Sequence, residues 1–306
     1  MHQKMIAACA SLLFAGAAFA AAPPPAAPPP DFSKVEILTM DLGKGTYMLV
    51  GQGGNITVAV GTDGIIMVDT QFAPLHDKIK AAVAKISPLP IKYIVNTHYH
   101  GDHTGGNELF QKDGATVVAD PNVGKRLASS VTNALTGAVT PPAATGAIPK
   151  QTYKDTTTLT FGGRGAQVMH EPYAHTDGDS AVYFADANVL ATGDIVSTGG
   201  RYPNIDVAVG GNIKGLIAAV DNYLKIANAD TKIVPGHGML MNKAALEDYR
   251  MMLVTARDRG AKLISDGNSE DDAVAAKPIV DLEQKAGASE MASANLVRLI
   301  YRSLKM

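Results

Sequence analysis

The feature that most constrains this chain is the junction between an apolar run and a group of histidines. The run IKYIVNTH (residues 91–98) is continuous enough in apolar residues to predict a buried strand. His98, His100, Asp102 and His103 follow directly at its end, and a pair of glycines comes after them. A fold that accommodates this junction must bury the strand and leave its end open to polar groups.

The spacing of these side chains suits metal ligation. His98 and His100 stand two positions apart, so in extended backbone both imidazoles project to the same side. Gly101 allows a sharp turn that directs Asp102 and His103 toward a second position nearby. Nitrogen and oxygen ligands without sulfur suit zinc and tolerate iron or manganese. The alternative is a solvated loop or an adventitious metal binder, but this ordered pattern after a buried strand favours a built site.

Around the cluster, the chain alternates between strands and helices in two similar halves. Each half has short β-branched runs, a helix and a further strand. The expected strands are 35–40, 46–50, 55–60, 64–70, 91–98 and 116–120, and then 166–171, 180–184, 188–194 and 231–237. The expected helices are 73–86, one after Pro121, and 213–227. The first four strands have the pattern of an antiparallel meander, and the repeated order predicts an α/β fold with two sheets face to face and helices outside.

Two further segments complete this prediction. Residues 137–150 have the composition of a long loop. A long amphipathic helix is expected near residue 250, with an apolar stripe through Leu246, Tyr249, Leu253 and Ala256. The tail from about residue 265 is mostly helical, with 291–304 as its best segment, and it carries no recognisable polar constellation.

The start of the chain is typical of an exported protein. Residues 1–20 combine a positive start, an Ala-rich apolar stretch and small residues at the cleavage positions, so they predict a signal peptide and a periplasmic or secreted protein. A retained membrane anchor is the alternative, but the stretch is too short and too rich in Ala to span a bilayer comfortably. Residues 21–33 form a Pro/Ala-rich linker. The single cysteine, Cys9, lies in the signal peptide, so the mature chain has neither disulfides nor thiolate ligands.

The composition argues against some functions. A formal net charge of -2 without a basic block gives no electrostatic footprint for nucleic acid. Trp is absent and aromatics make up 6% of the chain, which leaves few stacking platforms. We therefore expect a small-molecule substrate, no nucleic-acid partner and no stable membrane insertion after signal removal, while the sequence does not indicate the oligomeric state.

With these residues in place, the chain resembles the metallo-β-lactamase superfamily. HYHGDH matches that family's motif His-x-His-x-Asp-His, and the resemblance extends in order through AHTDGD, ATGD and PGHG. It implies a first metal site of His98, His100 and His175, a second site of Asp102, His103 and His237, and a bridging Asp194. It also implies a four-layer αβ/βα sandwich over residues 34–264, followed by a helical C-terminal extension at 265–306.

Residues that differ between branches of the family indicate which members this chain resembles. Zinc β-lactamases commonly have Cys or Ser where this chain has Asp194, so the chain is closer to glyoxalase II, lactonases and other Asp-bridged hydrolases. Flavodiiron relatives have Glu where this chain has His100, which argues against dioxygen reduction.

Several polar residues near the motifs need their own interpretation. Arg201 and Tyr202 lie on a glycine-rich loop after Asp194, so we expect them to bind substrate, with Arg201 receiving a carboxylate. Asp177 and Asp179 read as turn-forming aspartates rather than ligands. The remaining two are histidines outside the site: His170, a packing or supporting residue, and His76, a surface residue of the helix at 73–86.

The chemistry implied is hydrolysis at two zinc ions per chain, with iron or manganese as alternatives. Two cations about 3.5 to 4 Å apart share a hydroxide and polarise the scissile carbonyl. Asp102 would orient the hydroxide and Asp194 would set the spacing of the metals. The expected substrate is an ester, lactone, thioester or amide, β-lactams included. The alternatives are a mononuclear iron persulfide dioxygenase, a nuclease disfavoured by charge and export, and a non-catalytic metal-binding protein.

Overall fold

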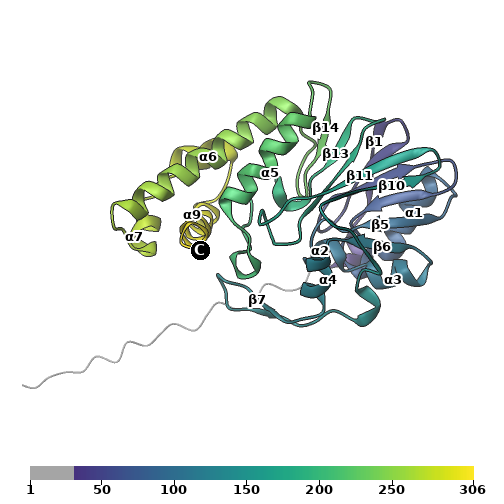
Figure 1. The fold of residues 1–306 in the computed structure, drawn as a ribbon, viewed down its shortest axis with the longest axis horizontal. Coiled ribbons are helices and arrows are strands. Elements are labelled where there is room, and N and C mark those ends of the chain that lie inside the picture. Colours follow the sequence, from purple (N-terminus) through teal and green to yellow (C-terminus); the bar gives the residue numbers. More distant parts are fainter. Residues whose placement is uncertain (1–30) are drawn as a thin grey trace, which may run out of the picture. The chain divides into compact units, whose positions relative to one another are not determined.

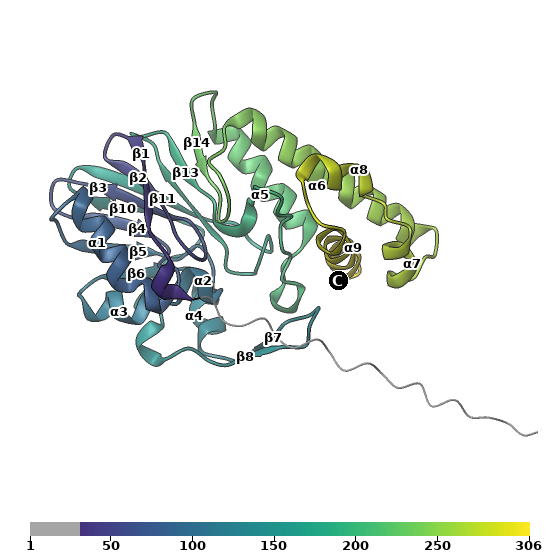
Figure 2. The ribbon, with the colours of Figure 1, turned by 180° about the vertical axis from the view of Figure 1, so that it is seen from behind.

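The computed structural model describes residues 31–306, and the expected signal peptide and most of the linker lie outside these residues. Residues 32–306 form one compact unit in which two sheets lie between layers of helices (Figures 1 and 2). The α/β class and the four-layer sandwich with C-terminal helices are thus confirmed.

The first sheet has seven strands in the order β1-β2-β3-β4-β5-β6-β9. Their bounds are β1 (Leu38–Gly43), β2 (Thr46–Val50), β3 (Ile56–Val60), β4 (Ile65–Val68), β5 (Ile91–Val95), β6 (Thr116–Ala119) and β9 (Gln151–Thr152). β1 to β4 pair antiparallel, as the predicted meander requires, and β4, β5, β6 and β9 pair parallel. The parallel strands β4, β5 and β6 therefore bring their carboxyl ends to one edge, where the histidine cluster begins.

The second sheet has five strands in the order β10-β11-β12-β13-β14. Their bounds are β10 (Thr156–Phe161), β11 (Arg164–His170), β12 (Ser180–Phe184), β13 (Val189–Ala191) and β14 (Lys232–Val234). β10 was not predicted from the sequence, because four of its six residues are threonines and only Leu159 and Phe161 are buried. β14 pairs parallel to β13, so these two strands also end on the same edge.

Residues 137–150, predicted as a long loop, contain regular structure. β7 (Val131–Thr132) and β8 (Val139–Thr140) form a two-stranded hairpin, and a 3-10 turn follows at Thr145–Ala147. The hairpin strands are too short and too exposed to show apolar alternation, so they could not be predicted from the sequence.

Helices cover the outer faces of both sheets. The first half contributes α1 (His76–Ile86), α2 (Gly101–Thr104), α3 (Asn107–Lys112) and α4 (Pro121–Leu127). The second half contributes α5 (Ile213–Ile226), α6 (Lys243–Ser265), α7 (Glu270–Ala275), α8 (Val280–Ala286) and α9 (Glu290–Leu304). The helices predicted at 73–86, 213–227 and 291–304 therefore form within one to three residues of the expected bounds.

Three apolar clusters hold the layers together. One lies between the sheets and includes Ala59, Val95 and Val182. A second packs α1 on the first sheet through Ile79, and a third packs α5, α6 and α9 against the second sheet through residues such as Leu253. Burial of apolar surface at these clusters stabilises the framework that carries the strand-end loops.

One prediction about α1 is wrong. His76 is buried rather than on the surface, and only 8% of it is exposed. Its ring packs edge-on against Phe110, and its two nitrogens lie 2.8 Å from Asp77 and 2.9 Å from Asp113. An imidazole can be buried here because both nitrogens have carboxylate partners, which the local sequence does not reveal.

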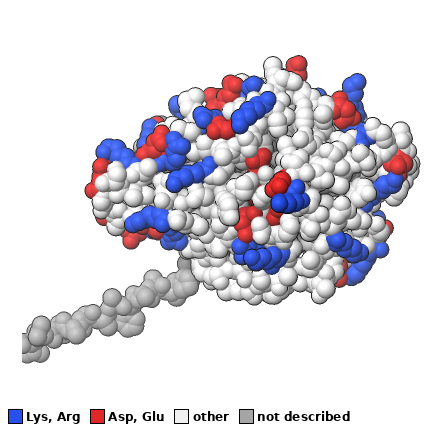
Figure 3. All heavy atoms as spheres, in the orientation of Figure 1, with Lys and Arg blue, Asp and Glu red and all other residues white. Residues whose placement is uncertain are grey.

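The outer surface shows two further properties. Positive and negative side chains are interspersed on the face drawn in Figure 3, without a patch of one sign. Within residues 31–306, no helix combines the length and the apolar character that crossing a bilayer requires.

Candidate metal centre

Seven polar side chains meet at the edge where β5, β13 and β14 end. They comprise all the ligands that the resemblance implies: His98, His100, Asp102, His103, His175, Asp194 and His237. His98 and His100 follow β5, and Asp194 lies in the 3-10 turn Gly193–Ile195 after β13. The chain enters the one-turn helix α2 at Gly101, so Asp102 and His103 stand on a helix turn rather than on an open loop.

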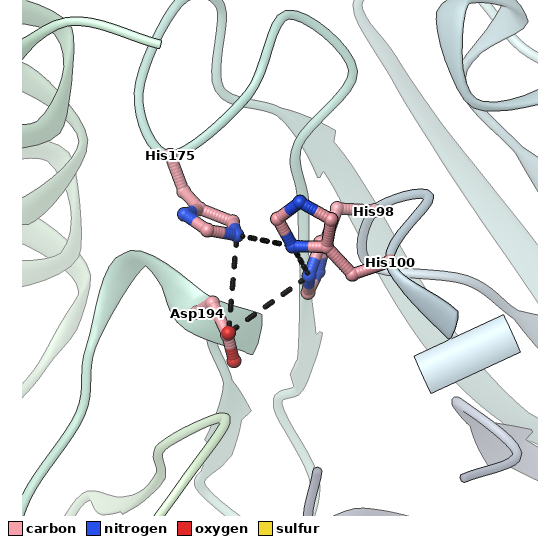
Figure 4. A group of neighbouring side chains, drawn as sticks. All are labelled: His98, His100, His175 and Asp194. Atoms are coloured by element: carbon pink, nitrogen blue, oxygen red, sulfur yellow. Dashed lines mark hydrogen bonds and ion pairs between the residues drawn. The ribbon is translucent and has the colours of Figure 1, made fainter. Parts of the chain in front are cut away.

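The first group combines His98, His100, His175 and Asp194 (Figure 4). Nδ1 of His100 lies 3.1 Å from Nε2 of His98 and 2.9 Å from Nε2 of His175. Oδ2 of Asp194 lies 3.9 Å and 3.8 Å from those two Nε2 atoms. Their ligand atoms all lie within 4.8 Å of one another, a spacing that suits one shared cation.

The second group combines Asp102, His103 and His237. Nε2 of His237 lies 3.2 Å from Oδ2 of Asp102 and 3.4 Å from Nε2 of His103. Oδ1 of Asp194 lies 3.1 Å and 3.4 Å from the Nε2 atoms of His103 and His237. Asp194 therefore presents one carboxylate oxygen to each group, the arrangement that a bridging ligand requires.

The polar atoms of the centre fit divalent cations. Asp194 Oδ1 is buried and accepts no well-formed hydrogen bond, although two imidazole nitrogens lie nearby. The ring nitrogens also face one another, and uncharged imidazoles that converge in this way present their lone pairs to a common point. Nitrogen and carboxylate donors without sulfur suit zinc, iron or manganese.

The pKa shifts of these side chains also favour the binding of cations. Burial, reinforced by the neighbouring His103 and His175, holds the pKa of His98 well below its usual range, so that its imidazole is neutral, the form that binds metals. In the second group, burial opposes protonation of His237, but the hydrogen bonds that its imidazole donates to Asp102 and Asp194 prevail and raise the pKa of His237 to about 9. Burial likewise opposes ionisation of Asp102, yet the hydrogen bond from His237 dominates and lowers the pKa of this carboxyl to about 2. The carboxylates thus attract positive charge into this group, whether as protons or as a cation.

A second set of contacts, which was not predicted from the sequence, orients the imidazoles. In three of the histidines, the ring nitrogen that points away from the centre contacts a partner. The partner of His103 is Asp69 Oδ2 at 2.7 Å, and that of His175 is the Asn204 carbonyl at 2.7 Å. The partner of His98 is Thr97 Oγ1 at 3.0 Å. In each case the partner fixes the ring so that its other nitrogen faces the centre. Asp69 directly follows β4, so its position at the end of a buried strand beside β5 was the available signal.

The remaining predicted residues lie around the centre without joining either group. Arg201 is exposed, whereas Tyr202 is half-buried and packs on the cluster under α5, α6 and α9. Asp179 accepts hydrogen bonds from the backbone N–H and the hydroxyl of Thr176, which is the predicted turn. Asp177, predicted to form a turn, forms an ion pair with Arg126 at 2.6 Å.

His170 also lies outside both metal-ligand groups. Its Nδ1 lies 3.0 Å from the Asp179 carbonyl and 3.5 Å from Asp120. Neither partner belongs to the two metal-ligand groups, so the supporting role of His170 stays a prediction.

A four-layer sandwich with histidine and aspartate groups at its strand ends defines a class of proteins built around divalent metal ions. Residues 49–237 match the model of the metallo-beta-lactamase superfamily. The chain therefore belongs to the metallo-β-lactamase superfamily.

Relatives of known activity are only partly similar. A linear primary-alkylsulfatase from Pseudomonas sp. (strain ATCC 19151) is 27% identical over 213 residues, which cover 58% of this chain and 40% of the relative. A hydroxyacylglutathione hydrolase from Synechococcus sp. (strain JA-3-3Ab) is 33% identical over 138 residues, which cover 44% of each protein. The chain thus spans less than half the length of these relatives.

Solved structures share the fold. A metallo-beta-lactamase from Pontibacter korlensis superposes with a TM-score of 0.58 at 18% identity, covering 71% of this chain and 99% of that one. A sec-alkylsulfatase from Pseudomonas sp. superposes with a TM-score of 0.66 at 19% identity, covering 86% of this chain and 49% of that one. Both similarities concern the fold alone.

Proposed function

We propose that this protein is an exported, metal-dependent hydrolase with two zinc ions per chain that cleaves an ester, lactone, thioester or amide, β-lactams included. The observation that carries the proposal is Asp194, which directs Oδ2 toward the first group and Oδ1 toward the second. A carboxylate whose two oxygens face different ligand groups fits a dinuclear centre better than a mononuclear one. The matched relatives include a hydrolase and a sulfatase, which supports hydrolysis as the reaction class.

The residues would divide the work as follows. His98, His100 and His175 would hold one ion, Asp102, His103 and His237 the other, and Asp194 would bridge the two. When bound, such ions lower the pKa of water to about 7 and polarise a carbonyl oxygen. The side chain of Asp102 is 29% exposed, so its carboxylate can accept a hydrogen bond from the attacking water and orient it. No Ser or Cys nucleophile is needed, and the mature chain expected from the sequence contains no Cys.

Metal analysis of the purified protein tests the metal content. The expected result is two zinc ions per chain. One iron per chain would favour the alternative, a persulfide dioxygenase-like enzyme. Tight zinc binding without turnover would instead indicate a non-catalytic metal-binding protein.

A substrate panel tests the reaction. It contains a chromogenic cephalosporin, lactones, thioesters including a hydroxyacylglutathione, carboxylic esters, an alkyl sulfate and a phosphodiester, each with and without chelator. We expect turnover of at least one acyl substrate, loss of that turnover with chelator, and recovery with added zinc. Turnover that survives complete metal removal would contradict the proposal.

Export is a separate part of the proposal, supported by the signal-like composition of residues 1–20. Expression of the full chain in a Gram-negative host should give a periplasmic protein whose mass corresponds to cleavage after Ala20 or Ala21. A full-length protein in the cytoplasmic fraction would contradict export without affecting the metal centre.

A further inference from the structure

A cavity of about 330 Å³ opens directly onto the metal centre, because Asp194 and His237 belong to its lining. Its other walls come from three distant segments of the chain. These are the loop from Gly200 to Asn204, the β7–β8 hairpin through Leu135, and the C-terminal helix α9. A substrate that reaches the centre through this cavity therefore contacts a helix that follows residue 237, where the match to the family model ends.

One face of α9 lines the cavity. Its lining residues are Ala292, Asn295, Leu296 and Leu299. They are spaced i, i+3, i+4 and i+7, which places them on a single helix face. Leu296 and Leu299 are buried, Ala292 is half-buried and Asn295 is exposed. This face is apolar except for one amide and carries no charge.

The tertiary contacts of α9 hold this face in place. Arg302 forms an ion pair with Glu270 of α7 and donates to the Ala134 carbonyl in the β7–β8 hairpin. The side-chain amide of Asn212 donates to the Ser303 carbonyl at 2.7 Å, which ties α9 to the start of α5. The hairpin wall and the helix wall are therefore linked to each other as well as to the core.

The rim of the cavity carries an arginine side chain that can bind an anionic group. Of the arginines in residues 31–306, Arg201 is the one without an ion pair in the structure. Arg201 is exposed and belongs to the same cavity lining as the uncharged face of α9. A guanidinium without a carboxylate partner is free to receive an anionic group of a ligand.

We propose that this face of α9, together with Leu135, selects the substrate by binding its apolar group, while Arg201 receives an anionic group of the same molecule. The proposal rests on the proposed function and deepens it, because it defines the substrate class as anionic molecules with a bulky apolar group. The helical C-terminal extension thereby acquires a role in specificity.

The first experiment measures binding of 4-phenylbutyrate and acetate to the metal-loaded protein by ligand-observed NMR titration. The wild type should bind 4-phenylbutyrate more tightly than acetate. Ala292→Phe and Asn295→Trp place a large side chain into the cavity from positions that are not fully buried. Each should weaken 4-phenylbutyrate binding about tenfold or more, because the phenyl ring loses its apolar contact, and should leave acetate binding unchanged.

The matched control is Met291→Phe, which adds the same ring at the neighbouring position of α9. Met291 is 72% exposed and does not line the cavity, so this variant should bind both probes like the wild type. If both filling variants bind 4-phenylbutyrate like the wild type, or if the wild type does not prefer it to acetate, the role of α9 is overturned. If the filling variants block 4-phenylbutyrate but no substrate of the panel is hydrolysed, the proposed function fails and the binding surface stands.

The second experiment isolates the anionic contact. Arg201→Ala should weaken 4-phenylbutyrate binding about tenfold and leave binding of the neutral 4-phenylbutyramide unchanged, because one charge-assisted contact is lost. Arg257→Ala is the control, since Arg257 lies outside the cavity and pairs with Asp258. Equal binding of 4-phenylbutyrate by the wild type and Arg201→Ala would overturn the anionic part of the proposal.

Discussion

The Nε2 atom of His100 lies 3.1 Å from Oδ2 of Asp206, although 106 positions separate the two residues. The same oxygen accepts a hydrogen bond from the hydroxyl of Tyr99, the residue between the two histidines of the motif. His100 therefore turns its Nδ1 toward His98 and His175, whereas those histidines use Nε2. One carboxylate outside the centre thus selects which nitrogen of His100 is available to a metal.

Replacement of Asp206 should weaken the first metal group. In Asp206→Ala the ring of His100 loses its orienting contact, and we expect metal affinity to fall about 10- to 100-fold. Competition with a fluorescent zinc chelator measures this change. Tyr99→Phe is the matched variant, because it removes the other hydrogen bond to the same oxygen and leaves the His100 contact. It should have a smaller effect, and equal affinities of Asp206→Ala and the wild type would contradict the assigned role.

Removal of a predicted ligand should abolish turnover and leave the fold intact. His98→Ala and Asp102→Ala each delete one donor from a different group, so we expect hydrolysis to fall by orders of magnitude. Metal analysis should show a lower metal content, and far-UV circular dichroism should be unchanged. Wild-type turnover in either variant would remove the proposed mechanism.

The close approach of Gly236 to Asp194 gives a third prediction. A Cβ at position 236 would lie 2.0 Å from Asp194 Oδ1, so Gly236→Ala must displace the carboxylate that faces both groups. We expect lower metal content and at least a tenfold loss of turnover. Gly101→Ala is the control within the motif, since a Cβ there would meet nothing within 4 Å. If Gly236→Ala retains full metal content and turnover, the position of Asp194 does not control the centre.

The sequence predicted which side chains come together but not the backbone conformation at Gly101. The motifs led to side chains that the structure brings together in two groups, because strand ends and residue types are local properties that the sequence carries directly. The reason given for Gly101 was incomplete, since the chain starts the helix α2 there and its φ is not in the left-handed region. Gly193, just before Asp194, does have a positive φ of 52°.

Features that depend on tertiary contacts could not be predicted. Asp206 and Asn204 reach the histidines from a loop that is distant in sequence, and no local pattern marks them. Strand β10 was not predicted because its exposed face consists of threonines. His76 was wrongly predicted to lie on the surface because its partner Asp113 is 37 positions away in the sequence. The α9 face was predicted as helix, yet its place beside the metal centre follows only from how α5, α6 and α9 pack.

The buried carboxyl of Glu171 predicts how stability depends on pH. Glu171 is 4% exposed, and its Oε2 accepts a hydrogen bond from Asn222 at 3.2 Å. Burial is the main cause that raises the pKa of Glu171 from 4.5 to about 7, and the charge of Asp179 adds to it. Because the folded state holds this proton more tightly than the unfolded state, the carboxyl contributes stability that is fully present below about pH 4.5 and is lost as the pH rises to about 7.

Glu171→Gln removes this titration and should keep a hydrogen bond to Asn222. We expect the free energy of unfolding of the wild type to fall by about 2 to 3 kcal/mol more than that of the variant between pH 5 and pH 8. Urea unfolding in the presence of chelator measures the difference, because metal loss would otherwise contribute its own pH dependence. Asp179, whose pKa burial raises to about 6, titrates in both proteins, so the difference between them measures Glu171 together with its electrostatic coupling to Asp179. Parallel stability profiles for the two proteins would show that Glu171 is already ionised in the folded state at pH 5.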